Sequence, residues 1–185
     1  MAFTPRLNSN GILGNFHWYS GNPFYTSGYG MPNCTCYAWG RFWEIGDPLG
    51  DGSNRPTGLP TSDGGSWFGD AIASGNYQVG QTPQLGAVAC FHDDSGGSGH
   101  VAIVEEIHPD GTIVTSNSAW QSTYFYTQTL SSSNNYAWSH YSFQGFIYNP
   151  FGGGTPTPPP TKKKHHFNFV LFDKRRRDRK YYEQR

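Results

Sequence analysis

The sequence has 185 residues, of which 35% are hydrophobic, 17% are aromatic and 14% are charged. This length suits one domain of about 100–200 residues. No apolar run approaches the ~20 residues that a bilayer requires, so a transmembrane protein is excluded. Glycine and proline together make up 37 residues, which favours short strands and turns over a coiled coil. Three cysteines are too few for a disulfide-dense scaffold.

The formal net charge of zero hides two oppositely charged parts. Residues 1–154 carry three cations against ten carboxylates, whereas residues 155–185 carry ten cations against three carboxylates. We therefore predict a mildly acidic domain over residues 1–150, a Gly/Thr/Pro linker over residues 151–161 and a basic aromatic tail over residues 162–185.

The first half of the domain carries helix signals and the second half carries strand signals. Capping and stop residues predict helices over Cys34–Ile45, with Asn33 as cap, and over Ser66–Ser74. Alternating and β-branched segments predict strands over 86–91, 100–107, 112–116, 123–130 and 143–148. Helices followed by an antiparallel sheet indicate an α+β fold.

Three residues suggest thiol chemistry. Cys34 begins the first predicted helix, where the helix dipole and free N–H groups favour a thiolate, so we expect a lowered pKa and a nucleophile. His100 starts a strand after a glycine loop, a position that suits a general base. Asn117 lies across the hairpin, where its amide can orient the imidazole. Taken singly, the three residues fit a buried thiol, a strand cap and a turn residue better than they fit a catalytic role.

Other chemistries find less support. The run His92-Asp93-Asp94 resembles a metal corner, but no second His or Cys pair stands at ligand spacing, so we predict no metal and no other cofactor. Asp47, Asp51 and Asn54 lack the pattern of a calcium loop and are interpreted as turn formers. Cys34 and Cys36 lack C-x-x-C spacing, which argues against redox chemistry.

Four segments occur in an order that resembles CHAP domains (cysteine, histidine-dependent amidohydrolase/peptidase). Residues 33–41 (NCTCYAWGR) resemble the cysteine segment, 79–89 the approach to the central strands, 99–105 (GHVAIVE) the histidine strand and 116–120 (SNSAW) the third motif. The resemblance covers about residues 15–150. Cys36, Asn117 and Ala119 depart from the common pattern, in which Trp, Glu and Asn stand at these positions.

The resemblance implies a papain-like fold with Cys34 as nucleophile, His100 as base and Asn117 as the orienting residue. The implied reaction is cleavage of amide bonds in the peptidoglycan of Gram-positive cell walls, by an N-acetylmuramoyl-L-alanine amidase or a peptidoglycan endopeptidase. Among many aromatic residues, Trp120, Tyr29 and Trp67 are expected to line a groove for glycan or stem peptide. The alternative is an inactive CHAP-like structural or assembly protein of a phage particle.

The tail and the N-terminus suggest where such a protein works. No secretory signal is visible at the N-terminus, so we expect synthesis in a host cytoplasm and action on the cell wall, as a phage endolysin or a virion-associated tail lysin. The tail is positive enough to bind polyanions such as teichoic acid, and its apolar run suits contact with other virion proteins. A solvated tail with no binding role is the other interpretation.

Overall fold

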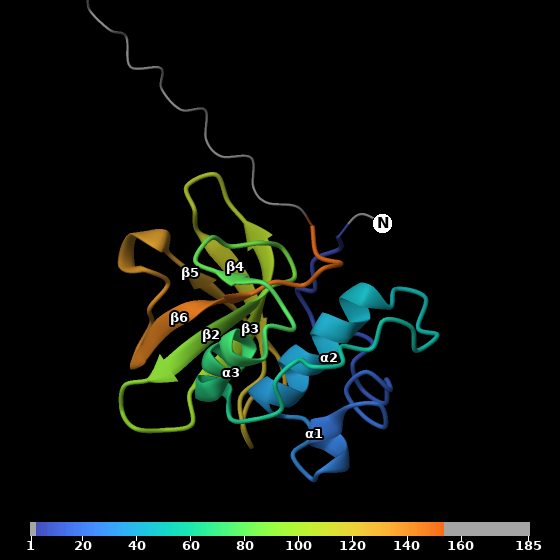
Figure 1. Ribbon diagram of the computed structural model, residues 1–185. Coiled ribbons are helices and arrows are strands. Elements are labelled where there is room, and N and C mark those ends of the chain that lie inside the picture. Colours follow the sequence, from blue (N-terminus) through green and yellow to red (C-terminus); the bar gives the residue numbers. More distant parts are fainter. Residues whose placement is uncertain (1–2, 154–185) are drawn as a thin grey trace, which may run out of the picture.

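The structure is a computed structural model that describes residues 3–153, and it contains one six-stranded sheet. All strand pairs are antiparallel, in the order β1-β6-β2-β3-β4-β5 (Figure 1). The strands are β1 (Val79–Gly80), β2 (Val88–Asp93), β3 (His100–Ile107), β4 (Ile113–Asn117), β5 (Tyr126–Leu130) and β6 (Tyr141–Ile147). The predicted tail and most of the predicted linker lie outside the described residues.

The helices precede the sheet in the chain, as predicted, and the α+β class is confirmed. They are α1 (Pro23–Thr26), α2 (Cys34–Gly46), the 3-10 turn η1 (Gly64–Ser66) and α3 (Trp67–Ser74), with a further 3-10 turn, η2 (Ser132–Asn134), between β5 and β6. Gly75 ends α3 in the left-handed region at φ 64°, where glycine carries no steric penalty. Ser66 occupies the cap position of α3 but makes no side-chain cap bond, because η1 leads into the helix.

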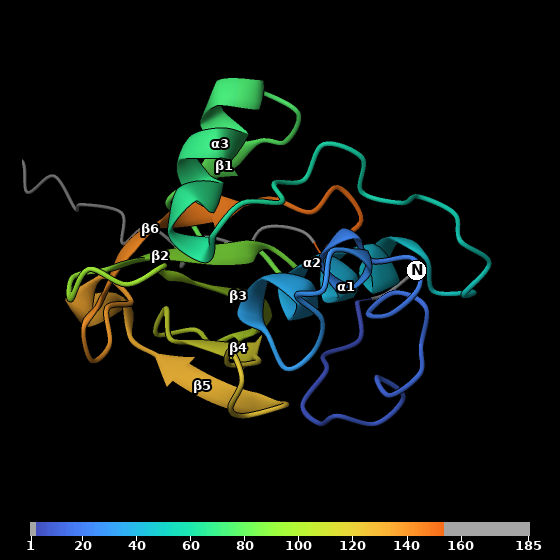
Figure 2. The same cartoon turned by 90° about the horizontal axis from the view of Figure 1, so that it is seen from below.

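Two apolar clusters cover the two faces of the sheet. The first lies between the helices and the sheet and includes Trp18, Tyr37 and Trp67, all fully buried, together with Val101 and Ile103 of β3. The second lies on the opposite face and includes Leu130 of β5, Phe143 and Phe146 of β6, and Tyr136 of the segment between these two strands. In Figure 2, α1 and α2 lie at one side of the sheet and the β5–β6 connection, in orange, lies at the opposite side.

A buried ion pair joins α2 to β3. The guanidinium of Arg41 donates to both carboxylate oxygens of Glu105, from Nε to Oε1 at 2.9 Å and from Nη2 to Oε2 at 2.9 Å. Glu105 is fully buried and also accepts from the Ser116 hydroxyl at 2.7 Å and from the backbone N–H of Arg6 at 2.8 Å. With every oxygen satisfied, the pair escapes the desolvation cost of an uncompensated buried charge and fixes the helix on its strand.

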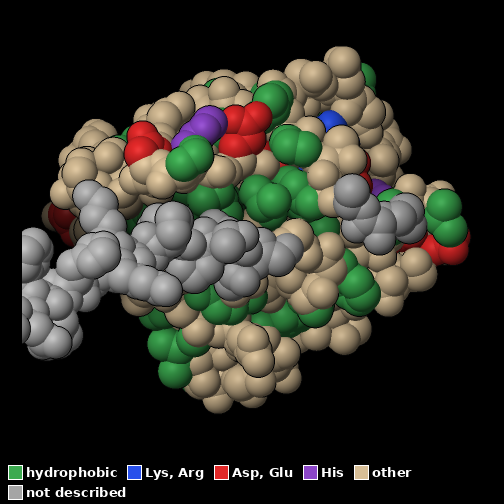
Figure 3. All heavy atoms as spheres, turned by 90° about the horizontal axis from the view of Figure 1, so that it is seen from above, with side chains coloured by type: hydrophobic (Ala, Val, Ile, Leu, Met, Phe, Trp, Pro, Cys, Tyr) green, Lys and Arg blue, Asp and Glu red, His purple; other side chains and the backbone are tan. Residues whose placement is uncertain are grey.

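The described surface carries little positive charge. Arg6, Arg41 and Arg55 are the only Lys or Arg residues within residues 3–153; Arg41 is buried, and both Arg6 and Arg41 are paired with Glu44. On the face shown in Figure 3, hydrophobic side chains gather in the middle and acidic side chains lie near the edge. Within residues 3–153, no helix is long and apolar enough to cross a membrane.

Replacing Glu105 by Gln should lower the free energy of unfolding by about 3–5 kcal/mol, because Arg41 then keeps its charge in a buried site without its counter-ion. Urea denaturation measures this loss. The matched control is Glu106→Gln on the same strand, whose carboxylate pairs with the partly exposed His108 and should contribute less than about 1 kcal/mol. Equal losses in the two variants would contradict the structural role given to the buried pair.

Candidate active site

Cys34 is the first residue of α2, and the residue before it fixes the helix start. The Asn33 side chain accepts from the Thr35 backbone N–H at 2.9 Å and from the Thr35 hydroxyl at 2.8 Å, which confirms Asn33 as the cap. The Asn33 backbone N–H donates to the Ser118 hydroxyl at 3.0 Å. The helix start is therefore tied directly to the residue that follows β4.

The predicted lowering of the Cys34 pKa is wrong. The thiol is only 9% exposed, and burial raises its pKa to about 11 because a thiolate there loses its hydration. The backbone N–H groups of Val101, Thr35 and Cys34 itself act in the opposite direction, as expected at a helix start, but they do not outweigh burial. The sequence displays the helix signal, whereas the burial comes from segments distant in the chain.

His100 and Asn117 lie in hydrogen-bond contact at the end of the sheet. His100 is the first residue of β3, Asn117 is the last of β4, and Nε2 of the imidazole is 3.0 Å from Oδ1 of the amide. The Asn117 Nδ2 group donates to the Thr115 carbonyl at 3.1 Å, and because a carbonyl only accepts, the amide oxygen must face the ring. In the neutral imidazole Nε2 therefore carries the proton, and Nδ1 is left with a free lone pair.

An aromatic enclosure surrounds the His100 ring. Trp138 meets it edge-on at a centroid distance of 5.7 Å, Tyr141 lies at 5.6 Å and Phe91 at 6.3 Å. Burial in this enclosure lowers the pKa of His100 to about 4, although the hydrogen bond with Asn117 partly opposes the shift. The imidazole is consequently neutral at physiological pH.

Cys34 and His100 share their neighbours. The backbone N–H of Val101, the residue next to His100 in β3, stabilises the charged form of Cys34. The Tyr141 ring packs on the His100 ring, and its pKa is raised by burial and then by the charges of Asp93 and Cys34. The start of β3 is itself fixed by close backbone packing. Gly99 has φ 75°, and a Cβ there would lie 2.3 Å from the Gly65 Cα, so only glycine fits. The structure thus brings the cysteine and the histidine to the same end of the sheet.

The three predicted substrate-binding aromatics fall into two groups. Trp120 and Tyr29 are 48% and 57% exposed, and their rings lie 5.9 Å apart. They flank the start of α2, because the Tyr29 carbonyl accepts from the Asn33 side chain at 2.9 Å. The expectation that Trp67 lines a substrate groove is wrong. Trp67 is fully buried, stacks on Phe24 and donates from Nε1 to the Ser62 carbonyl, so it is a core residue.

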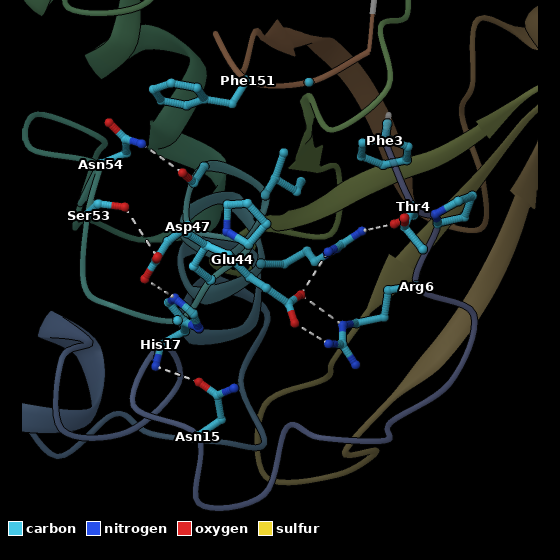
Figure 4. Close-up of a pocket in the computed structure, with 18 of the residues that line it drawn as sticks. Phe3, Thr4, Arg6, Asn15, His17, Glu44, Asp47, Ser53, Asn54 and Phe151 are labelled. Atoms are coloured by element: carbon cyan, nitrogen blue, oxygen red, sulfur yellow. Dashed lines mark hydrogen bonds and ion pairs between the residues drawn. The ribbon is translucent and has the colours of Figure 1, made fainter. Parts of the chain in front are cut away.

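A large cavity of about 990 Å³ lies at the other end of α2, away from Cys34. Figure 4 shows His17, Glu44 and Asp47 in its wall, together with segments from both ends of the described chain. The Asp47 carboxylate accepts from the backbone N–H groups of Asp51 and Gly52, so it forms the turn predicted for this region. Among residues 3–153, no three His, Cys, Asp or Glu side chains gather in a way that could hold a metal ion.

Several residues of this site are not among those that the sequence predicts. Ser118 ties α2 to the sheet, Trp138 and Tyr141 pack on the His100 ring, and Tyr126 lies opposite Asn117 on the neighbouring strand. Ser118 lies within the motif SNSAW, so the sequence indicates that it is near the site. The other three belong to segments without a local chemical pattern, and only the folding of the sheet brings them to the site.

Comparisons with known proteins identify a family, two relatives and one solved structure that are similar to this chain. The family model described as "CHAP domain" matches residues 24–119. Two relatives from Staphylococcus aureus (strain NCTC 8325 / PS 47) are described as "Probable autolysin LDP", 34% identical over 88 residues and 48% of this chain, and "Probable autolysin SsaALP", 33% identical over 113 residues and 61% of this chain. The matches span only 28% and 36% of those proteins.

A solved structure of an N-acetylmuramoyl-L-alanine amidase from Staphylococcus aureus is also similar. It is 25% identical to this chain, with a TM-score of 0.45, and the match covers 65% of this chain and 32% of the amidase chain.

The raised pKa of Cys34 predicts how the rate of its alkylation by iodoacetamide depends on pH. Because only the thiolate reacts and the pKa of Cys34 is about 11, the rate constant should rise about tenfold per pH unit from about pH 7 to pH 10. Mass spectrometry locates the modified cysteine, and Cys34→Ala provides the background from the two other buried thiols. A rate that is already constant between about pH 5 and pH 8 would indicate a thiolate–imidazolium pair and contradict the prediction.

Proposed function

Since the chain belongs to the CHAP domain family, we propose that it hydrolyses amide bonds of peptidoglycan with Cys34 as nucleophile. The observation that carries the proposal is the 3.0 Å contact between His100 and Asn117, at the end of the sheet where α2 begins with Cys34. The autolysin descriptions of two curated relatives support the substrate class. Because the match spans about a third of those relatives, the proposal concerns the reaction of this domain.

The reaction begins with proton transfer within the site. Asn117 holds the proton of His100 on Nε2, so the lone pair on Nδ1 accepts the proton of the Cys34 thiol. The sulfur then attacks the carbonyl carbon of the amide and gives a tetrahedral intermediate. His100 returns the proton to the leaving nitrogen, the C–N bond breaks, and a thioester remains on Cys34. Water, activated by the same imidazole, hydrolyses the thioester.

The burial of both groups suits a transfer coupled to substrate binding. Thiol and imidazole are each neutral in the free site, because burial disfavours the charged form of either one. The charges arise only when the sulfur attacks, and the N–H groups at the start of α2 then face the developing negative charge. A neutral Asn117 orients the imidazolium but stabilises it less than a carboxylate would.

The exposed pair of Trp120 and Tyr29 forms the proposed substrate platform. Their rings stand beside the helix start, and half of each side chain is open to solvent. Aromatic faces of this kind suit the apolar faces of sugar rings and peptide side chains. A glycan or stem peptide held there lies next to the Cys34 end of α2.

Three finer points go with this proposal: the bond that is cleaved, the source of the protein and the role of the tail. The thiol chemistry serves an N-acetylmuramoyl-L-alanine amidase and a peptidoglycan endopeptidase equally, and the cleaved bond distinguishes them. A phage or prophage source, with synthesis in a host cytoplasm and a role as endolysin or tail lysin, has no support from the bacterial relatives and stays a prediction. The same holds for binding of teichoic acid or virion proteins by the tail.

The test is hydrolysis of purified Staphylococcus aureus sacculi, followed by loss of turbidity and by mass spectrometry of the released fragments. Cys34→Ala should remove activity, and His100→Ala should lower the rate by roughly 10²–10⁴-fold because the general base is lost. Asn117→Ala should cause a smaller loss.

The control for the first variant is Cys36→Ala, the same change two residues along the helix, which should remain active. Circular dichroism verifies folding of each variant. A folded Cys34→Ala protein that still digests the sacculi would overturn the proposed mechanism.

A further inference from the structure

Two tyrosines from distant strands of the sheet lie near the candidate site. Tyr126 is the first residue of β5 and pairs with Asn117, whereas Tyr141 is the first residue of β6 and pairs with Asp93. Three strands separate β5 from β6 in the sheet, yet Tyr126 is affected by the charges of both Cys34 and Tyr141. Asn117 contacts His100 at 3.0 Å, and the Tyr141 ring lies 5.6 Å from the His100 ring, so both tyrosines lie beside the histidine.

Both hydroxyls are free to donate. Neither Tyr126 nor Tyr141 makes a side-chain hydrogen bond within residues 3–153, unlike Tyr136, which donates to Gly111, and Tyr148, which donates to Thr82. Both side chains are partly exposed. Burial raises the pKa of Tyr126 to about 12, so its phenol keeps its proton at physiological pH and remains a donor.

The surroundings distinguish the two phenols. The Tyr141 ring packs against Trp138 at a centroid distance of 4.8 Å and against His140 at 4.3 Å. After burial, the charge of Asp93 contributes most to the rise of its pKa. Tyr126 makes no ring pair with another described aromatic residue. After burial, the charge of Cys34 contributes most to the rise of its pKa. Its position opposite Asn117 also puts it on the face of the sheet that carries His100.

Resting on the proposed function, we propose that the Tyr126 hydroxyl is the side-chain donor to the oxyanion, alongside the backbone N–H of Cys34. When the Cys34 sulfur forms its bond to the carbonyl carbon, the π electrons move to the carbonyl oxygen. The phenol donates a hydrogen bond to that oxygen and keeps its proton. When the C–N bond breaks, the electrons return to re-form the carbonyl, and His100 supplies the proton to the departing nitrogen.

The experiment compares Tyr126→Phe with the matched control Tyr148→Phe, in the full chain and with a soluble muropeptide as substrate. Loss of one oxyanion donor should lower kcat by roughly 10²–10³-fold, with KM changed less than about threefold. Tyr148→Phe, which removes a hydroxyl bonded to Thr82, should retain the wild-type kcat. Alkylation of Cys34 by iodoacetamide forms no oxyanion, so its rate should be unchanged in Tyr126→Phe.

Three results would overturn the assignment: a Tyr126→Phe kcat within about threefold of wild type, a loss that appears in Tyr141→Phe instead, or equal losses in kcat and alkylation rate. The last would identify a structural effect on the thiol. Cys34→Ala separates this inference from the proposed function, because an active Cys34→Ala protein refutes the thiol mechanism itself. If Cys34→Ala is inactive and Tyr126→Phe is fully active, only the role of Tyr126 fails.

Discussion

The site depends on the fixed position of α2 against β3, and the Arg41–Glu105 ion pair is the interaction that sets it. Arg41 lies two turns along the helix from Cys34, and Glu105 lies on the strand that His100 begins. Both oxygens of Glu105 are occupied by buried donors, so helix and strand cannot slide without leaving a charge unpaired. The same two elements thereby carry the proposed nucleophile and the proposed base at one end and the ion pair that joins them further along.

The position of Cys34 at a helix start favours a thiolate, but burial keeps both Cys34 and His100 uncharged. The thiol and the imidazole are both uncharged before substrate binds, because the enclosing aromatic side chains and the packing of α2 exclude water. The donors that stabilise negative charge are already in place as backbone N–H groups and, in our proposal, as a phenol. Such preorganised dipoles need little rearrangement when the charge develops.

Local signals predicted much of the arrangement. The Asn33 cap, the helix that begins at Cys34 and the strand His100–Ile107 follow from short-range patterns, and the structure confirms them. Long-range packing was beyond such signals. Arg41 and Glu105 are 64 positions apart, so no spacing indicates their pairing. Trp67 was assigned to a groove because composition does not tell a core tryptophan from a surface one. The pKa of Cys34 was predicted in the wrong direction because the burying segments come from elsewhere in the chain.

The most direct test is to trap the covalent intermediate. A soluble muropeptide is mixed with the full chain, the reaction is stopped with acid within the first turnover, and intact-mass and peptide-mapping spectrometry follow. The account predicts an acyl group on Cys34, bound as a thioester, with a mass that also identifies which amide was cut. Turnover without any adduct, or an adduct on another residue, would contradict it.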